Sequence, residues 1–369
     1  MQAVVLVGGE GKRLRPLTLT KPKPFLSLAN GPFLDHTLRM LKRHGVTEVI
    51  LATGYLPSAI EDYFAGGRYG LKVHCVSEDT PLDTCGAVVN VADMIDDTFL
   101  VFNGDILTGM NLTHLVAEHK LKQAKATISL TWVEDPTAYG LVSFDESGWV
   151  TGFLEKPTLE QVTSHWINAG VYVLERDALD LAPRGVRYSF ERGLFPRLLK
   201  EDLGVLSFCS SDYWADIGSP ENYLLAHHNI LYGKVPFDFA GTEISPGVWA
   251  GRGTKVDPEA TLSGPTIIGE DCLVGKGAKI SSLCSIGDEC TIGENAVVEE
   301  SVILSGSTIG SLSIIKESIL GECVEIGRRV QVTQGAVVGD GTLIGDENHF
   351  AKNVRIWPNA EIGDNSIRF

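Results

Sequence analysis

The sequence predicts two domains of different class, an α/β domain with a mostly parallel sheet followed by a left-handed parallel β-helix. Short apolar strands alternate with amphipathic helices up to about residue 235, and from about Ile244 an apolar residue recurs every six positions. The 369 residues are enough for two domains. We therefore expect an α/β domain over 1–236 and a hexapeptide-repeat domain over 237–369.

The first half begins with a regular alternation of strands and helices. We expect strands over 2–7, 48–52, 71–77, 99–102 and 126–132, and helices over 33–44, 58–64, 87–95 and 112–123. Gly45 ends the first of these helices, and Asn111 is placed to cap the last. Such alternation is typical of a Rossmann-like sheet with helices on both faces, which binds ligands beyond the carboxyl ends of its strands.

The alternation changes after Tyr139. We expect a hairpin that turns at Gly148, and then further elements that complete the domain. These are hairpin strands over 141–144 and 150–153, a strand over 167–174, a helix over 191–199, a strand over 204–207 and a helix over 221–231.

The second half has a period of six residues. Apolar side chains stand at every sixth position from Ile244 to Val298, and the frame slips by one residue before Ile303 and again before Leu320. A helix cannot use this period, whereas in a triangular β-helix each hexapeptide forms one face and the apolar residues stack inside. The alternative of a loop-rich β-sandwich accounts poorly for a period that persists through some twenty units.

Composition and charge restrict the class of protein. Hydrophobic residues make up 44% of the chain, and no apolar run approaches the roughly 20 residues of a membrane span. The net charge of −16 would repel nucleic acid. The seven cysteines include no Cys-x-x-Cys pair, which favours buried apolar cysteines over a zinc site or a disulfide framework. The chain starts on a strand with no signal-like segment, so we expect a cytoplasmic protein.

The most informative segment follows the first strand. Gly8, Gly9 and Gly11 form a glycine turn. Five basic residues within twelve positions follow it, Lys12, Arg13, Arg15, Lys21 and Lys23. Glycine lets backbone N–H groups approach an anion closely, and cations neutralise phosphate. The spacing matches neither G-x-G-x-x-G nor a Walker loop, so the segment predicts a phosphate site of another kind.

Five further motifs stand in the first half, and each is common by itself. They are Lys21-Pro22-Lys23-Pro24, Asn103-Gly104-Asp105, Glu155-Lys156-Pro157, Asn168-Ala169-Gly170 and Asp216-Ile217-Gly218. The prolines would present Lys23 on a stiff backbone. Taken singly, the aspartates could be turn residues, the Glu-Lys pair a solvated ion pair, and the asparagine a partner of the backbone. The order and spacing of all six motifs make coincidence a poor explanation.

Together, these motifs resemble those of the sugar-1-phosphate nucleotidyltransferase family. The glycine loop reads Gly8-Gly9-x-Gly11-x-Arg13-Leu14-x-Pro16-Leu17-Thr18, and the repeat domain resembles that of mannose-1-phosphate guanylyltransferases and their relatives. The resemblance covers essentially the whole chain. It implies that a nucleoside triphosphate and a sugar 1-phosphate give a nucleotide-sugar and pyrophosphate, with GTP and mannose 1-phosphate as the favoured substrates.

The resemblance also implies a role for each matched residue. Gly8, Gly9 and Gly11 would wrap the triphosphate, Arg13 would hold the phosphates and the leaving pyrophosphate, and Lys23 would contact the α-phosphate. The remaining residues would serve the metal and the sugar: Asp105 and Asp216 hold Mg²⁺, Lys156 grips the sugar phosphate, Glu155 and Asn168 bond sugar hydroxyls, and Gly170 leaves room for the sugar.

The chemistry of this reaction agrees with the residues present. The attacking phosphate oxygen is already ionised near pH 7, because the second phosphate pKa is about 6. The reaction therefore requires no general base, and the sequence contains no evident nucleophile arrangement. Positioning and charge neutralisation would carry the catalysis.

The choice of base depends on one loop. The stretch from Ser77 to Gly86 resembles the base-contacting loop of the family, which places Glu78 and Gly86 among the expected substrate-binding residues. A carboxylate accepts two hydrogen bonds, and guanine offers two adjacent donors, whereas uracil and thymine offer one donor flanked by acceptors. Glu78 therefore favours GTP, with a solvated loop carboxylate as the alternative. The family often has Gly where Asp83 stands.

Three other readings keep the same fold. The chain could be a glucose-1-phosphate thymidylyl- or uridylyltransferase, or a non-catalytic regulatory paralogue, although such a paralogue would be expected to lose charged motif residues that are all present here. Acetyl transfer on the β-helix would depend on His349, which is more simply explained as a surface or inter-coil residue. Exposed edges of the repeats predict a homo-oligomer.

Overall fold

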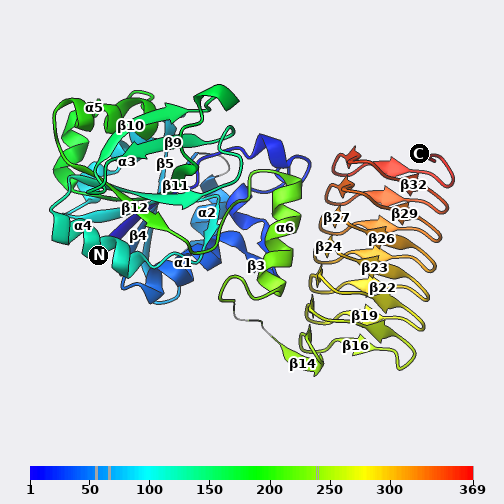
Figure 1. Cartoon of the computed structure of the whole chain (residues 1–369). Coiled ribbons are helices and arrows are strands. Elements are labelled where there is room, and N and C mark those ends of the chain that lie inside the picture. The colour runs from blue at the N-terminus through cyan, green and yellow to red at the C-terminus, as the bar shows by residue number, and fades with distance from the viewer. Residues whose placement is uncertain (55–56, 65–67, 238, 240, 369) are drawn as a thin grey trace. The chain divides into compact units, whose positions relative to one another are not determined.

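The computed structural model describes residues 1–54, 57–64, 68–237, 239 and 241–368. Contacts divide the chain into two compact units. The α/β unit comprises Met1–Glu10 and Leu34–Ala215, and the β-helix unit comprises Gly11–Phe33 and Asp216–Phe369. Figure 1 shows their elements, and both architectures have the predicted fold class. The segment 11–33 therefore groups with the hexapeptide coils, although it lies early in the sequence.

The α/β unit is built on a mixed sheet in the order β10-β9-β11-β6-β1-β4-β5, with β8 between β11 and β12. Its strands are β1 (Gln2–Leu6), β4 (Glu48–Thr53), β5 (Lys72–Ser77), β6 (Phe99–Asn103), β8 (Ala126–Trp132), β9 (Gly140–Phe144), β10 (Val150–Glu155), β11 (Trp166–Leu174) and β12 (Val205–Ser210). Strands β5, β4, β1 and β6 are parallel, as the β-α-β alternation predicts. Strand β11 runs antiparallel to β6, β8 and β9, so the second half of the sheet departs from the Rossmann pattern.

The helices agree with the predictions except at α3 and at the start of α5, where the predicted first residues form a π-helical turn instead. They are α1 (Phe33–Arg43), α2 (Pro57–Phe64), α3 (Asp83–Asn90), α4 (Leu112–Lys122) and α5 (Phe195–Lys200). The predicted helix over 87–95 begins four residues earlier, because the Glu78 carboxylate accepts a hydrogen bond from the Leu82 N–H and closes the preceding turn. Asn111 caps α4 as predicted, since its side chain accepts from the His114 N–H.

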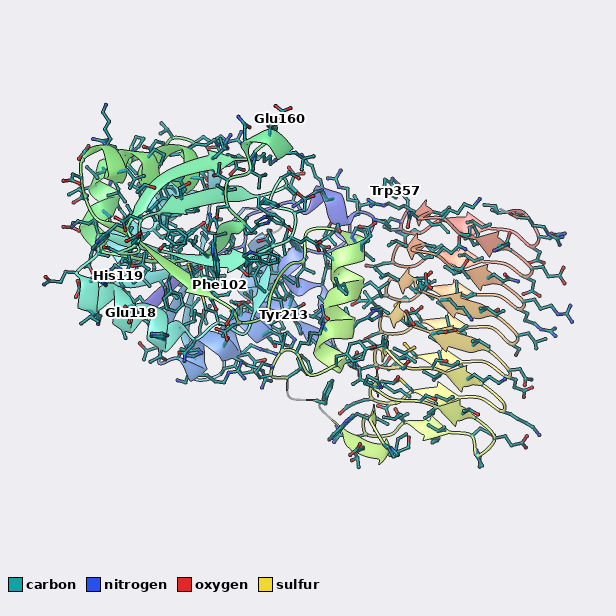
Figure 2. The ribbon with its side chains drawn as sticks, in the orientation of Figure 1. Phe102, Glu118, His119, Glu160, Tyr213 and Trp357 are labelled. Carbon is teal, nitrogen blue, oxygen red and sulfur yellow. The ribbon has the colours of Figure 1, made fainter. Side chains whose placement is uncertain are left out.

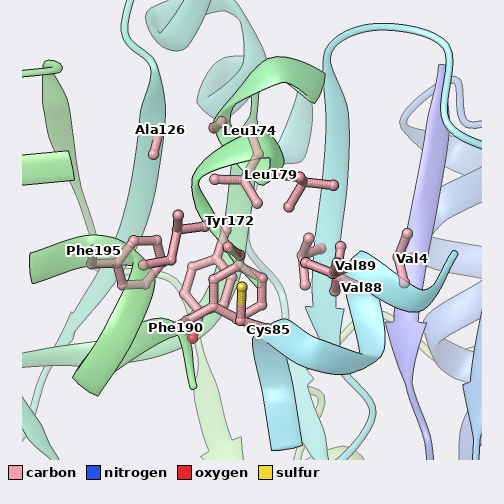
Figure 3. Packing of buried hydrophobic residues seen from close by; sticks show 14 of the residues in the cluster. Val4, Cys85, Val88, Val89, Ala126, Tyr172, Leu174, Leu179, Phe190 and Phe195 are labelled. Atoms are coloured by element: carbon pink, nitrogen blue, oxygen red, sulfur yellow. The ribbon is translucent and has the colours of Figure 1, made fainter. Parts of the chain in front are cut away.

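The core of the α/β unit is rich in aromatic side chains where β11 packs on the segment 190–200. Figure 3 shows Tyr172, Phe190 and Phe195 packed together beside Cys85. The ring centroids of Phe190 and Phe195 are 5.3 Å apart, and those of Tyr172 and Phe195 are 5.1 Å apart. Each such pair contributes about 0.5–1.5 kcal/mol beyond the burial of its area. This cluster fixes the start of the segment 190–200, which begins with a π-helical turn (Phe190–Leu194).

The β-helix unit contains three parallel sheets, one on each face of the coils. The first has β15 (Val248–Ala250), β18 (Thr266–Ile268), β21 (Cys284–Ile286), β24 (Val302–Ile303), β27 (Ile319–Leu320), β30 (Val337–Val338) and β33 (Arg355–Ile356). The second has β16 (Lys255–Val256), β19 (Leu273–Val274), β22 (Thr291–Ile292), β25 (Thr308–Ile309), β28 (Glu325–Ile326), β31 (Leu343–Ile344) and β34 (Glu361–Ile362). The third has β17 (Thr261–Leu262), β20 (Lys279–Ile280), β23 (Val297–Glu299), β26 (Ile314–Lys316), β29 (Gln331–Val332) and β32 (His349–Phe350).

The register explains the two slips of the six-residue frame. Partners on neighbouring coils are 18 positions apart, as for Ile268 and Ile286, but 17 apart for Ile286 and Ile303 and again for Ile303 and Leu320. Each slip is therefore a coil shortened by one residue, and the apolar column continues through it. Ile244 is an exception to the predicted column. It lies on β14 (Thr242–Ser245), antiparallel to β15, and is 47% exposed.

Glycine follows many column residues because the coils meet closely at their corners. A Cβ at Gly310 would lie only 2.3 Å from the carbonyl oxygen of Gly327 on the next coil. Of the cysteines, Cys272, Cys284 and Cys290 are buried in the column as predicted. Two others, Cys209 and Cys323, are exposed instead.

The β-helix unit also includes α6 (Pro220–Leu231) and the segment 11–33 with its short strands β2 (Ser27–Leu28) and β3 (Gly31–Pro32). Ser219 caps α6 by accepting from the Asn222 N–H at 3.2 Å, and Pro220 occupies the first turn, where it needs no partner for an N–H. The described helices include none with the length and apolar character needed to cross a membrane.

Candidate functional site

The predicted site residues are distributed over both units. The α/β unit carries Gly8, Gly9, Glu78, Gly86, Asp105, Glu155, Lys156, Asn168 and Gly170, and the β-helix unit carries Gly11, Arg13, Lys23 and Asp216. The glycine loop thus crosses the boundary between units at the bond from Glu10 to Gly11.

In the α/β unit, the start of the glycine loop and Asp105 follow neighbouring strands. Strands β1 and β6 are parallel partners, with Leu6 opposite Asn103. The turn after β6 packs closely on the end of β1, because a Cβ at Gly104 would lie 2.4 Å from the Leu6 carbonyl oxygen. Gly9 has open space around it, since a Cβ there would meet nothing within 4 Å. The structure therefore brings the Gly8-Gly9 turn and Asp105 to one edge of the sheet.

Glu78 is held within the loop that precedes α3. Its Oε2 accepts a hydrogen bond from the Leu82 N–H at 2.9 Å, and burial raises the pKa of the Glu78 carboxyl. Gly86 lies where α3 packs on a later segment, and a Cβ there would be 2.8 Å from the Val186 carbonyl oxygen. Glu78 therefore shapes the loop, and its contact with a base stays a prediction.

Asp83 stands where the backbone has a conformation that favours glycine. Its φ is +64°, in the left-handed region that glycine adopts without strain and aspartate tolerates better than most residues. The Asp83 side chain holds this conformation, because Oδ1 accepts from the Thr84 N–H at 2.9 Å and Oδ2 lies 3.5 Å from both Arg187 Nε and Arg192 Nη2. The departure from glycine therefore preserves the backbone.

A cavity of about 290 Å³ contains two predicted sugar residues, Glu155 and Asn168. Glu191 and Arg192, which the sequence analysis did not select, also line it. Gly140 leaves room for the first carboxylate, since a Cβ there would lie 2.9 Å from Glu155 Oε2. The cavity thus combines carboxylates that can accept hydroxyl hydrogens with a guanidinium that can bind an anion.

Glu191 is the best-supported side chain of this cavity. Its Oε1 accepts from Tyr172 Oη and from Asn168 Nδ2, both at 3.2 Å, and its Oε2 accepts from Ser189 Oγ at 2.7 Å. Tyr172 is fully buried, and burial together with the charge of Glu191 raises the pKa of its hydroxyl. This hydroxyl therefore stays a donor that fixes the carboxylate.

Asn168 and Gly170 contribute mainly to the shape of this site. Asn168 Oδ1 accepts from the Gly170 N–H at 2.9 Å, and its Nδ2 donates to Tyr172 Oη at 2.8 Å. Gly170 has a φ of +72°, and a Cβ would lie 2.3 Å from Ile106 Cδ1, so packing alone requires glycine there. The proposed contacts of both residues with a sugar stay predictions.

Glu155 and Lys156 stand at the end of β10. Partial burial and the negative charge of Glu191 raise the pKa of the Glu155 carboxyl. Lys156 is exposed and has a φ of +49°, which is uncommon for a residue with a side chain. Such backbone strain clusters at functional positions.

In the β-helix unit, a tight turn presents the basic residues. Gly11 has a φ of +60°, and a Cβ would lie 2.9 Å from Thr18 Cγ2. Its carbonyl accepts from Thr18 Oγ1 at 2.8 Å and from the Leu14 N–H at 2.9 Å. The 3-10 turn Lys12–Leu14 follows and leaves the Arg13 side chain 74% exposed. Lys23, by contrast, is buried in a second 3-10 turn between prolines, and its contact with the α-phosphate stays a prediction.

The structure brings Arg13 and Asp216 together. Arg13 Nη2 lies 3.7 Å from Asp216 Oδ2. Gly218 provides the space for this pair, since a Cβ there would lie 2.7 Å from Arg13 Nη2 and 2.8 Å from Asp216 Oδ1. The backbone carbonyl of Asp216 accepts from Asn222 Nδ2 at 2.9 Å. The sequence motif Asp-x-Gly therefore has a steric reason.

The chain before Asp216 is fixed within the α/β unit. The Tyr213 carbonyl accepts from Thr108 Oγ1 at 2.8 Å and from the Gly109 N–H at 3.0 Å, and Tyr213 is labelled in Figure 2. Trp214 Nε1 donates to the Ala169 carbonyl at 2.9 Å. The strand β13 (Trp214–Asp216) is thus held next to the Asn168-Ala169-Gly170 motif.

With this geometry described, comparison with known proteins decides the family. Residues 2–232 match the nucleotidyl transferase family, and residues 244–368 match the GMPPB C-terminal domain. The chain belongs to the nucleotidyl transferase family. It is a nucleotidyltransferase, as the glycine loop and the five further motifs predict.

Relatives within the nucleotidyl transferase family extend over most of the chain. A mannose-1-phosphate guanylyltransferase from Mycobacterium tuberculosis is 40% identical over 76% of this chain and 78% of its own length. A UTP–glucose-1-phosphate uridylyltransferase from Synechocystis is 31% identical over 76% of this chain and 82% of its own length. A crystal structure of HddC from Yersinia pseudotuberculosis complexed with GMP-PN aligns with a TM-score of 0.53 at 29% identity, covering 61% of this chain and 97% of that protein.

Nucleotidyl transferase family members typically use a divalent metal. The described residues contain no group of three or more His, Cys, Asp or Glu placed to hold a metal ion. Asp105 belongs to the α/β unit and Asp216 to the β-helix unit, so their assignment to one ion stays a prediction. Two carboxylates completed by substrate phosphate oxygens are a donor set suited to a hard divalent cation.

Proposed function

We propose that the chain transfers the guanylyl group of GTP to mannose 1-phosphate, giving GDP-mannose and pyrophosphate. The 40% identity to a mannose-1-phosphate guanylyltransferase over three quarters of the chain carries the proposal. The match of residues 244–368 to the GMPPB C-terminal domain and the acceptor Glu78 support it further. Every charged motif residue expected of a catalyst is present, which argues against a non-catalytic paralogue.

The reaction is an in-line displacement at the α-phosphorus. An oxygen of the sugar phosphate forms the new P–O bond, the bond between the α- and β-phosphates breaks, and pyrophosphate leaves with the electron pair. Because the attacking oxygen is already ionised, the protein must mainly align two polyanions and neutralise their charge. Arg13 and Lys23 would serve the triphosphate, and Lys156 would serve the sugar phosphate.

The cavity with Glu155 and Glu191 would bind the sugar ring. The two carboxylates can accept hydrogen bonds from sugar hydroxyls, and Glu191 is oriented for this by Tyr172 and Asn168. Arg192 would add a positive charge toward the phosphate. Asn168 would bond sugar hydroxyls and Gly170 would leave room for the sugar. In addition, the hydrogen bond between these two residues would hold the arrangement in place.

Asp105 and Asp216 would hold Mg²⁺, which prefers carboxylate and phosphate oxygens. The ion, when bound, neutralises charge on the phosphates. Arg13 Nη2 lies 3.7 Å from Asp216 Oδ2, and glycine at 218 leaves room for this pair.

We further propose the domain limits 1–236 and 237–369, a cytoplasmic location and a homo-oligomer built through the repeats, with no nucleic-acid partner. The two family matches, which end at 232 and resume at 244, support the limits. The net charge of −16 supports the exclusion of nucleic acid. Light scattering of the full chain tests the oligomer, and a monomer at all concentrations would contradict it.

The transfer is tested by a matrix of four nucleoside triphosphates against mannose, glucose and galactose 1-phosphates, with Mg²⁺ and pyrophosphate release as the readout. We expect GTP with mannose 1-phosphate to give the highest kcat/KM. A highest value for UTP or dTTP with glucose 1-phosphate would favour the uridylyl- or thymidylyltransferase, in line with the relative from Synechocystis. No turnover in any combination would favour the non-catalytic paralogue.

The contact of Glu78 with guanine is tested by Glu78→Gln. The amide offers one acceptor and one donor group, so it pairs poorly with two adjacent guanine donors. We expect the ratio of kcat/KM for GTP to that for UTP to fall about tenfold or more. The neighbouring Asp79→Asn is the matched control, because Asp79 is exposed. An unchanged ratio in Glu78→Gln would remove the argument for guanine.

A further inference from the structure

The segment that carries Arg13 lies against one face of the β-helix. At the lower coils, Asn30 Nδ2 donates to the Ile286 carbonyl at 2.7 Å, and Ser285 Oγ donates to Asn30 Oδ1 at 3.3 Å. Both β-helix residues belong to β21. The far end of the segment is thus attached to the first of the three sheets.

Two coils further on, the same face binds the middle of the segment. Lys21 forms an ion pair with Glu322, and Thr20 Oγ1 donates to Asp340 Oδ2 at 2.5 Å. Asp340 also uses its other oxygen to accept the Glu322 N–H at 2.8 Å, which fixes the corner between coils. A rigid carboxylate therefore receives the Thr20 hydroxyl.

Arg355 completes this series at the last strand of the sheet, β33. Its Nη1 donates to the carbonyl oxygens of Arg13 and Arg15, both at 3.1 Å. These two carbonyls lie on either side of Leu14, at the end of the 3-10 turn Lys12–Leu14. A guanidinium suits this role because its donors have a fixed planar geometry.

We propose that Arg355 is a positioning residue for nucleotidyl transfer, which orients Arg13 by holding the backbone of its turn. The inference rests on the proposed function, because it assigns the effect to the contact of Arg13 with the triphosphate. It places a determinant of the rate in the repeat domain, at a residue that does not itself touch substrate.

The side chain of Arg13 makes this positioning necessary. It is 74% exposed, and its ion pair with Asp216 spans 3.7 Å, which is a weak restraint for a solvated arginine. Its direction therefore depends on the backbone that carries it. When Arg355 is removed, water replaces the donor at both carbonyls, and the turn gains freedom that the transition state must then remove.

The test compares Arg355→Ala, Arg355→Lys and the wild-type full chain. We expect Arg355→Ala to lower kcat/KM for the triphosphate about tenfold to a hundredfold, with the KM for the sugar 1-phosphate unchanged. Arg355→Lys keeps one donor group and should recover part of the rate. Deuterium uptake in peptides covering 11–21 should rise in Arg355→Ala, while the Tm of the whole chain stays within about 2 °C of wild type.

Arg252→Ala is the matched control, because Arg252 is an exposed β-helix arginine paired with Glu270. It should leave both the kinetics and the uptake unchanged. Thr20→Val removes the hydroxyl that donates a hydrogen bond to Asp340. It should lower kcat/KM and raise deuterium uptake as Arg355→Ala does, but by less. Wild-type kcat/KM or wild-type uptake in Arg355→Ala would overturn the proposal. A wild-type chain without any transferase activity would contradict the proposed function instead, and the uptake comparison would still decide whether Arg355 holds the turn.

Discussion

The sugar-side cavity of the α/β unit and the Arg13 turn of the β-helix unit are held in opposite ways. In the cavity, the Glu191 carboxylate is held by hydrogen bonds from three other side chains, those of Tyr172, Asn168 and Ser189. At the turn, a distant side chain holds backbone carbonyls, and the Arg13 side chain itself stays exposed. The difference teaches that local packing can fix a side chain itself, as for Glu191, whereas at the turn only the backbone that carries Arg13 is fixed.

The largest effect should come from Asp105 and Asp216, one in each unit, which we propose as metal ligands. Asp105→Asn and Asp216→Asn should each lower kcat about a thousandfold, because a neutral amide binds a hard divalent cation poorly. Circular dichroism should remain that of wild type. Asp180→Asn, an exposed carboxylate paired with Arg176, should leave turnover unchanged. Wild-type rates in both site variants would refute the metal assignment and leave the two regions functionally separate.

Lys156→Ala should have the next largest effect and should be confined to the sugar side. We expect the KM for the sugar 1-phosphate to rise about tenfold or more while the KM for the triphosphate is retained, since only the phosphate of the sugar loses a cation. Steady-state kinetics with each substrate varied in turn measures the split. Lys125→Ala, which removes a cation paired with Asp177, is the control. An equal change in both KM values would contradict a dedicated sugar-phosphate contact.

Glu155→Gln tests whether the Glu155 carboxylate lowers the stability of the folded state while it strengthens sugar-phosphate binding. Because the fold raises the pKa of Glu155, the folded state favours the protonated carboxyl over the ionised one. The stability that this protonation contributes is complete below the unfolded pKa of about 4.3, and it is lost as the pH rises through the pKa of Glu155 in the folded state. The variant should therefore have a higher Tm than wild type at pH 7 and an equal Tm at pH 4, with weaker sugar-phosphate binding. Because solvent reaches Glu155, the rise should be small. A lower Tm at pH 7 would show that other contacts of the carboxylate outweigh its repulsion from Glu191.

The smallest effect concerns the loop before α3. Asp83→Ala should lower the free energy of unfolding by about 1 kcal/mol, because alanine is strained at a φ of +64° and cannot accept the Thr84 N–H. Asp83→Gly, which relieves the backbone but loses the contacts with Arg187 and Arg192, should be closer to wild type. Urea denaturation measures both. A larger loss in Asp83→Gly than in Asp83→Ala would mean that the side-chain contacts dominate the backbone term.

Much of the fold could be predicted because its signals are local. The β-α-β alternation and the period of six depend on neighbouring residues alone, and even the frame slips at Ile303 and Leu320 are readable as shortened coils. The start of α3 was predicted wrongly because it depends on a bond from Leu82 to Glu78 that the periodicity does not contain. The same holds for the antiparallel pairing of β11 with β6, which joins elements far apart in sequence.

The same distinction between local signals and long-range contacts applies to the candidate site. Residues at strand ends and in motifs, such as Asp105 and Arg13, could be selected from the sequence. Glu191 could not, because its role depends on Tyr172 and Asn168, which only the folded sheet brings to it. Arg355 was also beyond reach, since it contacts a carbonyl 342 positions earlier in the chain.

The stacking of coils has a consequence for the far end of the polypeptide. A solenoid frays from its termini, and β33 is the outermost strand of its sheet. A premature stop that removed only the final coil would leave all of the first 236 residues in place, yet it would delete Arg355 and its two hydrogen bonds to the turn near the N-terminus. The contacts of Thr20 with Asp340 and of Lys21 with Glu322 would remain, but the carbonyls of Arg13 and Arg15 would lose their donor from the final coil.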